Sequence, residues 1–295
     1  MKIITVTLNP CTDVDYRLSS PFRAGELNRV PSPRVSVCGK GINVSRALLG
    51  LGRDSVAMGI FGSDGAEESL RAEGLDVVAV NCRGNLRRNT SIIDSNGAQT
   101  QINEPGIYVS EEKLREFIGL YKSELNCQGG CVVVLSGSIP PGVPADIYRK
   151  LCTIARNAGA YVILDCDGNA LKEGMESIPD LIKPNREEFE EINGKPLSGS
   201  GSELRENAAG EALRFHLTNH SSVLLSLGED GSVYAGPEGC FLCEARKADI
   251  KTFKGAGDSF LASFILHHVV EDKDCEMSLI LASGESARYL SADVR

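Results

Sequence analysis

The chain has 295 residues, 42% hydrophobic and 24% charged, a balance that predicts a globular protein with a sizeable core. Forty acidic residues outweigh 31 Lys and Arg residues, giving a net charge of -9, and no block of basic residues offers a nucleic-acid surface. The longest apolar stretch, 131–145, is broken by Gly and Pro and is shorter than the roughly 20 residues of a membrane-spanning helix. No export signal is recognisable, so we expect a cytoplasmic protein that neither crosses a membrane nor binds nucleic acid.

Short apolar, β-branched runs alternate with segments of helical periodicity along the chain. The runs predict buried strands at 3–8, 56–61, 77–80, 132–135, 161–164, 181–182 and 223–227. Helices are predicted between and after them at 43–51, 66–73, 111–125, 144–157, 186–192, 203–217 and 257–270. This alternation predicts an α/β fold, with a doubly wound, mostly parallel sheet flanked by helices in a single domain over 1–295.

Two segments, 12–37 and 87–103, fall outside this rhythm. They are more polar, they alternate Val, Ile or Tyr with Ser, Asn or Asp, and the second contains the hairpin signal Ser95-Asn96-Gly97. We predict that they form a small β-sheet that grows from the main domain. The Gly- and Ser-rich stretch 197–202 is predicted to be a flexible surface loop.

Ten cysteines are scattered from Cys11 to Cys275, several of them in strand-like runs, which is typical of small reduced hydrophobic residues. The Cys-x-x-Cys of Cys240 and Cys243 lacks further ligands at metal-binding spacing and is predicted to be an ordinary strand. His216 and His220 share a helix face but lack the Glu of a metalloprotease motif, which favours a solvated surface.

Ligands of open α/β sheets bind at the carboxyl ends of the strands, so chemistry is expected in the loops there. Gly255-Ala256-Gly257-Asp258 opens the helix predicted at 257–270, where glycines and a helix N-terminus together suit an anion. Asp258 is either a capping carboxylate or a general base, and residue chemistry alone favours the cap. The motif matches neither a P-loop nor a dinucleotide-binding fingerprint, so a Walker-type ATPase and a dinucleotide enzyme lose their strongest support.

A second glycine pair lies in Gly39-Lys40-Gly41-Ile42-Asn43 and opens the helix predicted at 43–51. Glycine allows close approach to a ligand, and Lys40 and Asn43 supply a cation and an amide. An ordinary Gly-rich turn into a helix has the same pattern, so this motif alone leaves both interpretations open.

Together, these two elements resemble the signature motifs of the PfkB family of ribokinase-like carbohydrate kinases. The likeness covers nearly the whole chain and is strongest to the branch of 1-phosphofructokinases and tagatose-6-phosphate kinases. Further matching blocks occur in the same order at 7–13, 25–29, 136–142, 183–188 and 226–228. The resemblance implies a ribokinase-like fold in which 12–37 and 87–103 form a lid, and a homodimer that pairs through this lid.

The resemblance also implies roles for individual residues. Asp258 would take the proton of the sugar hydroxyl, and the backbone N–H groups of Gly255, Ala256 and Gly257 would stabilise the transferring phosphoryl group. Sugar hydroxyls would be bound by Asp13, Gly39 and Asn43. A phosphate already on the sugar would be bound by Lys40, Arg29 and Arg87, with Asn89 also at the substrate.

The same resemblance implies which residues bind the nucleotide. ATP would be contacted by Asn185, Ser226, Gly228, Gly255 and Gly257. Asn185 and Glu188 match an Asn-x-x-Glu element that helps hold Mg²⁺ through its waters. Without the other blocks, this pair would be interpreted as a helix start with an acidic face.

Three features depart from the family pattern. Thr252-Phe253-Lys254 stands where the family has Asp or Asn and then small or β-branched residues. Lys254 would either add a cation near ATP or point to solvent, and the second is favoured. Cys38 replaces a common glycine, and Ser91 stands where many relatives have Lys, which bears on the affinity for substrate phosphate.

The function implied is ATP-dependent phosphorylation of a ketohexose phosphate. The segment 282–291 resembles the C-terminal segment of the 1-phosphofructokinases, which favours conversion of fructose 1-phosphate to fructose 1,6-bisphosphate. The segment Asp13-Val14-Asp15-Tyr16 is more similar to the tagatose-6-phosphate kinases, so both substrates remain open. From another class, a catalytically idle regulator that binds a sugar phosphate would not need Asp258, whose retention argues against it.

Overall fold

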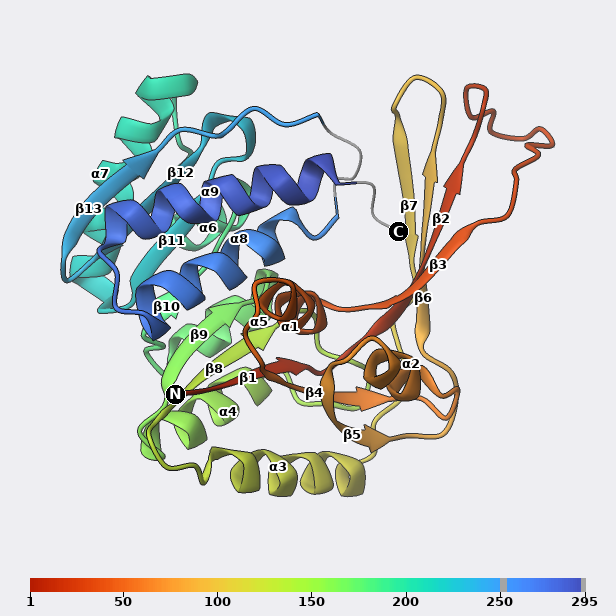
Figure 1. Cartoon of the computed structure of the whole chain (residues 1–295), viewed down its shortest axis with the longest axis horizontal. Helices are drawn as coiled ribbons and strands as arrows, with labels where there is room; N and C mark the ends of the chain where they lie inside the picture. The colour runs from red at the N-terminus through yellow and green to blue at the C-terminus, as the bar shows by residue number, and fades with distance from the viewer. Residues whose placement is uncertain (250–253, 293–295) are drawn as a thin grey trace.

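The computed structural model describes residues 1–249 and 254–292, and its main feature is a nine-stranded sheet with helices on both faces (Figure 1). The strand order is β13-β12-β11-β10-β9-β8-β1-β4-β5. All neighbours from β11 to β5 are parallel, and β12 and β13 add an antiparallel edge. In chain order the strands are β1 (Lys2–Thr7), β4 (Val56–Phe61), β5 (Asp76–Asn81), β8 (Cys131–Ser136), β9 (Tyr161–Asp165), β10 (Leu181–Ile182), β11 (Ser222–Ser226), β12 (Ser232–Gly236) and β13 (Gly239–Cys243). The predicted doubly wound, mostly parallel sheet is confirmed.

The central strands are apolar along their length because both faces of the sheet are covered. In β8, Val133 and Leu135 join one core cluster, whereas Val132 and Val134 join the cluster on the other face. The first cluster is covered by α3 (Glu111–Leu125), α4 (Ile147–Asn157), α5 (Gly168–Met175), α6 (Arg186–Asn193) and α7 (Gly201–Asn219). The second is covered by α1 (Lys40–Gly50), α8 (Ala256–Phe264) and α9 (Cys275–Ser291), while α2 (Ala66–Ala72) packs in a third cluster.

Several element boundaries differ from the predictions. The helix predicted from 43 begins at Lys40, and the one predicted at 257–270 is α-helical to Phe264 and then continues as a π-helix (Ile265–Val270). The predicted loop at 197–202 is wrong at its end because α7 begins at Gly201. Cys240 and Cys243 lie in β13, as predicted. Among the described residues, no helix has the length and hydropathy to cross a membrane.

The two polar segments form a separate four-stranded sheet, here called the lid, in the order β3-β2-β6-β7. Its strands are β2 (Cys11–Arg17), β3 (Arg34–Cys38), β6 (Arg87–Ile93) and β7 (Gln99–Asn103). Figure 1 shows this sheet beside the main body, facing the N-terminus of α8. The prediction of a small sheet outside the α/β core is confirmed.

The register gives the lid two different faces. Asp13 lies opposite Ser36 and Asn89, and Asn89 lies opposite Asn103, so these polar side chains share one face. Along the next row, Val14 lies opposite Val35 and Thr90, and Thr90 lies opposite Ile102. The lid is therefore polar on the face with Asp13 and mostly apolar on the other.

Candidate active site

Asp258 lies in the first turn of α8 and is buried, with 8% of its surface exposed. The side-chain amide of Asn43, from α1, donates a hydrogen bond to Oδ2 of Asp258 over 2.8 Å. Burial and then the charge of Asp165 raise the pKa of Asp258 to about 6, against the opposing effects of Asn43, Lys183 and Lys40. A carboxylate with this pKa is mostly ionised at neutral pH and can accept a proton.

The glycine motif Gly255 to Gly257 begins α8 directly before this carboxylate, and the region in front of its backbone N–H groups is here called the glycine pocket. Gly255 caps α8 with φ of 87°, and a Cβ there would come 2.6 Å from the hydroxyl of Tyr289 on α9. Glycine is therefore required both by the backbone conformation and by the contact with α9. A Cβ on Gly257 would lie 3.8 Å from Nζ of Lys183. The helix N-terminus and this ammonium together suit a negatively charged group.

Asp165 lies at the carboxyl end of β9, is fully buried, and joins two lysines. Its Oδ1 is 3.2 Å from Nζ of Lys183 and 3.3 Å from Nζ of Lys40. Burial alone would raise the pKa of Asp165, but the charges of Lys183 and Lys40 outweigh burial and lower it. Its Oδ2 is also buried and accepts no hydrogen bond in the described structure. This oxygen is free to accept a ligand or a bound water.

Glu188 brings a second carboxylate to the same group. Its Oε1 lies 3.9 Å from Nζ of Lys40, while its Oε2 accepts the backbone N–H of Asn185 over 2.9 Å. Asn185 Oδ1 in turn accepts the backbone N–H of Glu188, which completes a capping box at the start of α6. The oxygens of Asp165 and Glu188 fit Mg²⁺, which prefers oxygen ligands and keeps several waters. The side-chain carbonyl of Asn185 is instead used by the cap.

The predicted nucleotide residues lie at the ends of neighbouring strands. Asn185 and Ser226 form a parallel bridge, and the N–H of Ser226 donates to the carbonyl of Pro184 over 3.1 Å. Gly228 begins a short 3-10 turn directly afterwards. The structure thus brings Asn185, Ser226 and Gly228 together at the carboxyl ends of the strands, where Asp165 also lies.

The lid contributes the predicted sugar residues. Asn89 lies opposite Asp13, and Arg87 lies opposite Cys11, so all three candidate side chains share the polar face. Asn89 Oδ1 and Arg87 Nε are buried and have no hydrogen-bond partner in the described structure. Unsatisfied buried polar atoms are rare because they carry a free-energy penalty, so these two atoms suit a polar ligand.

The three cations predicted for the sugar phosphate do not converge. Arg87 is on the polar face of the lid, but Lys40 pairs with Asp165 and Glu188, and Arg29 is exposed in the long connection between β2 and β3. The ammonium of Lys40 is drawn to the carboxylates at the strand ends because it sits on the first residue of α1. Gly39 caps α1, and a Cβ on Gly41 would lie 2.8 Å from the carbonyl oxygen of Val6, so Gly41 serves packing on β1.

Sequence reasoning missed three side chains that complete this region, and misplaced a fourth. The only sign of Asp165 in the sequence is that it follows the strand predicted at 161–164. Lys183 lies in the matching block 183–188, but no role was assigned to it. Tyr289 on α9 lies in the segment 282–291, which had been used only to choose the sugar. Lys254 was predicted to point to solvent, which is wrong, because it pairs with Asp13 and Asp15. Thr252 and Phe253, which depart from the family pattern in the same segment, lie outside the described residues.

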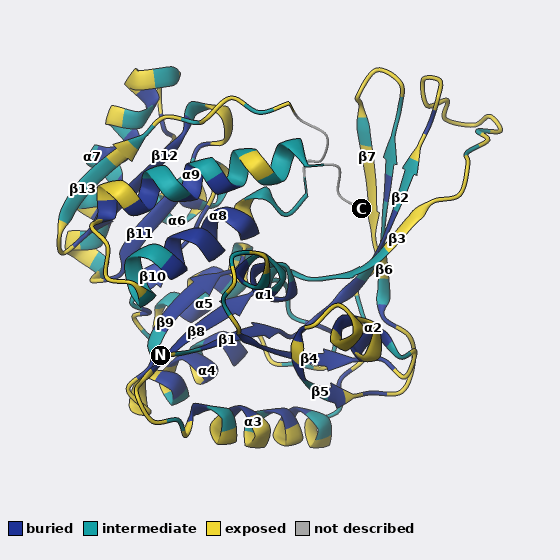
Figure 2. Cartoon of the chain, viewed as in Figure 1, coloured by how far each residue is buried: buried dark blue, intermediate teal, exposed yellow. Residues whose placement is uncertain are grey.

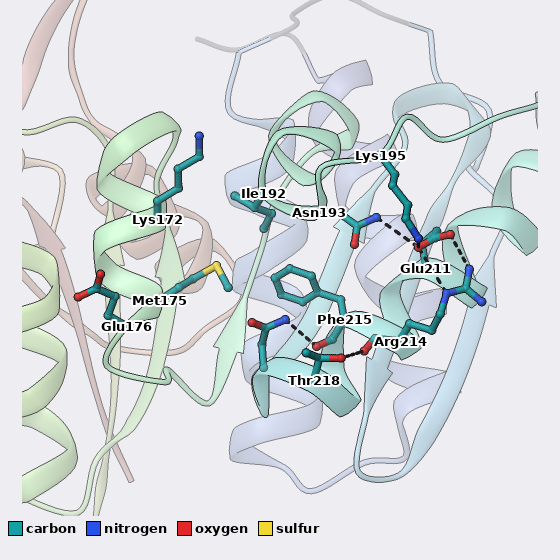
Figure 3. Close-up of a pocket in the computed structure, with 11 residues that line it drawn as sticks. Lys172, Met175, Glu176, Ile192, Asn193, Lys195, Glu211, Arg214, Phe215 and Thr218 are labelled. Carbon is teal, nitrogen blue, oxygen red and sulfur yellow. Dashed lines mark hydrogen bonds and ion pairs between the residues drawn. The ribbon is translucent and has the colours of Figure 1, made fainter.

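A cavity of about 620 Å³ lies elsewhere, between α5, α6 and α7 (Figure 3). Ile192 and Asn193, which line it, are at the C-terminal end of α6, whereas Asn185 and Glu188 are at the other end. Its charged groups are paired: Glu211 with Arg214 and Lys195, and Lys172 and Glu176 with residues outside the lining. None of the predicted site residues lines this cavity.

The parallel sheet, the strand-built lid and the buried carboxylate at the start of α8 define a ribokinase-like kinase. The chain belongs to the pfkB family of carbohydrate kinases, whose family model matches residues 4–287. It is 33% identical over 266 residues to a 1-phosphofructokinase of Bacillus subtilis (strain 168), covering 89% of this chain and 84% of that relative.

Solved structures agree with this assignment. Phosphofructokinase-2 from Escherichia coli, in complex with substrates and products, superposes with a TM-score of 0.89 at 25% identity, covering 100% of this chain and 95% of that chain. A Thermotoga maritima protein described as a possible 1-phosphofructokinase gives a TM-score of 0.81 at 27% identity, covering 99% and 92% of the two chains.

Proposed function

We propose that this carbohydrate kinase transfers the terminal phosphoryl group of ATP to fructose 1-phosphate and forms fructose 1,6-bisphosphate. The observation that carries the proposal is the buried Asp258, with a pKa of about 6, in the first turn of α8 directly after the Gly255 to Gly257 motif. The similarity to a 1-phosphofructokinase over 89% of the chain supports this choice of sugar.

Each group near Asp258 has a role that its chemistry allows. Asp258 accepts the proton of the attacking hydroxyl, and Asn43 fixes the carboxylate through the hydrogen bond to Oδ2. The N–H groups of Gly255, Ala256 and Gly257, with the Lys183 ammonium, offset charge on the transferring phosphoryl group. Lys40 faces the same phosphates rather than the sugar phosphate, because its partners are Asp165 and Glu188.

The nucleotide end is assigned to Asn185, Ser226 and Gly228. Mg²⁺, held by Asp165 and Glu188, would supply neutralisation of the nucleotide phosphates. Oδ2 of Asp165 has no hydrogen-bond partner in the described structure, and Oε1 of Glu188 lies outside the capping box, so these two oxygens can receive a cation or its waters.

At the sugar end, Asp13 and Asn89 would bind hydroxyls, and Arg87 would bind the phosphate already on the sugar. The unpaired Asn89 Oδ1 and Arg87 Nε support this assignment, because a bound sugar phosphate would give both a partner. Arg29, exposed in the connection between β2 and β3, stays a predicted ligand of this phosphate. The single-domain organisation and the cytoplasmic location stay predictions.

We also propose that the lid pairs with the lid of a second copy. Phe22, Leu27, Val35 and Ile102 are large exposed hydrophobic residues in the lid segments. Figure 2 shows exposed stretches along β3 and β7 of the lid. Val35 and Ile102 lie on the face opposite Asp13, so a partner lid would cover them without blocking the site.

A coupled assay of ADP release tests the substrate. We expect turnover with fructose 1-phosphate to exceed turnover with tagatose 6-phosphate, fructose 6-phosphate and free fructose at equal concentrations. Higher efficiency with tagatose 6-phosphate would reassign the sugar within the same reaction. Preference for a free sugar would contradict the proposed phosphate site, and no ADP release with any sugar would contradict the kinase assignment of this site.

A further inference from the structure

Lys254 joins the glycine pocket to the lid. It directly precedes Gly255, and its Nζ lies 2.9 Å from Oδ1 of Asp15 and 3.3 Å from Oδ2 of Asp13. The two carboxylates are 239 and 241 residues away along the chain. An ion pair between parts of the sequence so far apart exists only because the fold brings the lid up to the start of α8.

The two carboxylates face Lys254 together because they alternate along one strand. Asp13 and Asp15 are two residues apart in β2, so both side chains stand on the polar face of the lid. Asp13 is buried, and its Oδ1 accepts the thiol of Cys11 over 3.4 Å. Burying a carboxylate beside a second one is unfavourable unless a cation compensates. Lys254 is that compensating cation in the described structure.

The ammonium of Lys254 stays charged in this place. Burial alone would lower the pKa of Lys254, but the hydrogen bond to Asp15 and the charge of Asp13 raise it. Its side chain is 29% exposed, so most of it is shielded from water. The ion pair is therefore less screened than a pair on the open surface.

We propose that Lys254 is a positioning residue that holds β2 against the glycine pocket and orients Asp13 toward the sugar, a role that rests on the proposed function. Asp15 is the main anchor, since its contact with Lys254 is the shorter one. Asp13 shares the cation through Oδ2 and is thereby held in place for sugar hydroxyls. Without the cation, the two carboxylates repel each other, and the lid loses a contact with the body.

The test is Lys254→Met, which keeps the length of the stem and removes the charge. We expect the KM for the sugar phosphate to rise about tenfold, while kcat and the KM for ATP change less than about threefold. Lys254→Arg should restore most of the affinity because it restores the charge. Asp15→Asn should raise the same KM by a smaller factor, and the double variant should be no worse than Lys254→Met alone.

Lys247→Met is the matched control, since Lys247 is exposed in the same connection before α8. It should leave all three kinetic constants near those of the unchanged protein. Amide hydrogen exchange without substrates gives a readout independent of activity: Lys254→Met should speed exchange across 11–17, whereas Lys247→Met should not.

The outcomes separate the two proposals. If no sugar phosphate is turned over by the unchanged protein, the proposed function fails, and hydrogen exchange alone decides whether Lys254 holds the lid. A loss confined to kcat, with the sugar KM unchanged, would overturn the proposal and place Lys254 at the transferring phosphoryl group. Unchanged exchange over 11–17 together with an unchanged sugar KM would also overturn it.

Discussion

Asp258 is placed for both of the roles that sequence reasoning had set against each other, stabilising the helix start and accepting a proton. It stands in the first turn of α8, where a carboxylate is stabilised by the helix N-terminus, and it also faces Asn43 and the glycine pocket. Burial raises its pKa to about 6, which the helix position alone would not do. A carboxylate needed only as a cap would not have to be buried near Asp165.

Asp258→Asn should remove most of the turnover while the fold is retained, because the amide has nearly the same shape but cannot accept the proton. A general base contributes roughly 10²- to 10⁴-fold, so we expect kcat to fall by about that factor. Steady-state kinetics at saturating Mg²⁺ and ATP measures the loss, and thermal unfolding checks the fold. Near-normal turnover in the variant would exclude Asp258 as the base.

The pH dependence follows from the same pKa. Because the ionised carboxylate is the active form, kcat/KM should be level above about pH 7 and fall tenfold per unit below about pH 6. Asn43 stabilises the ionised form, so Asn43→Ala should move this acid limb to higher pH. A limb that stays in place in Asn43→Ala, or one with a midpoint near 4, would contradict the assignment of the limb to Asp258.

At the scale of elements, predictions succeeded where the local pattern was strong. The helix predicted at 111–125 matches α3, because Ser110 caps it and Leu114, Phe117 and Tyr121 form one buried stripe. In contrast, α9 was missed, since its buried face is built largely from small or polar residues such as Ser278, Ala282, Ser283 and Glu285. The short α5 was missed too, with Gly168 and Gly174 weakening its helical signal.

In the candidate site, too, the residues with a strong local sequence pattern were predicted and the others were not. Asp258 and the glycine motif could be found because they are contiguous in the sequence. Lys183 and Asp165 could not be paired, because their contact depends on β9 and β10 lying side by side. Lys254 was misplaced for a similar reason: its partners belong to β2, and no local pattern links them. Contacts created by topology alone leave no mark in residue spacing.

The start of α8 depends on Gly255, and this yields a prediction with an internal control. Gly255→Ala should lower kcat at least tenfold and cost about 1–3 kcal/mol in stability, because φ is 87° and the new Cβ would clash with Tyr289. Gly52→Ala has a similar φ of 77° but no neighbour within 4 Å. It should therefore lose stability alone, as thermal unfolding and kinetics of both variants would show. Full activity in Gly255→Ala would mean that this pocket is not needed.

For the whole molecule, the parallel sheet explains how a site is assembled from distant segments. The carboxyl ends of strands β9 and β10 lie on the same side of the sheet, and helices α1, α6 and α8 begin there. This arrangement brings together Asp165, Lys183, Lys40, Glu188 and Asp258. The lid then adds Asp13, Asn89 and Arg87 from a separate sheet. In the proposed function, the carboxyl ends of the strands would bind the phosphates and the lid would recognise the sugar, so sugar specificity could vary with little change to the core.

The apolar face of the lid favours association of two copies of the chain. Val35 and Ile102 are 58% and 59% exposed on that face, and burial of such side chains favours association. We expect a dimer at micromolar concentration in sedimentation velocity, and Val35→Lys with Ile102→Lys should give a monomer because the introduced charges would be buried at the interface. Met277→Lys, at an exposed site on α9, should leave the dimer intact. A monomeric unchanged protein, or a dimer that survives both lid substitutions, would place the contact between copies elsewhere.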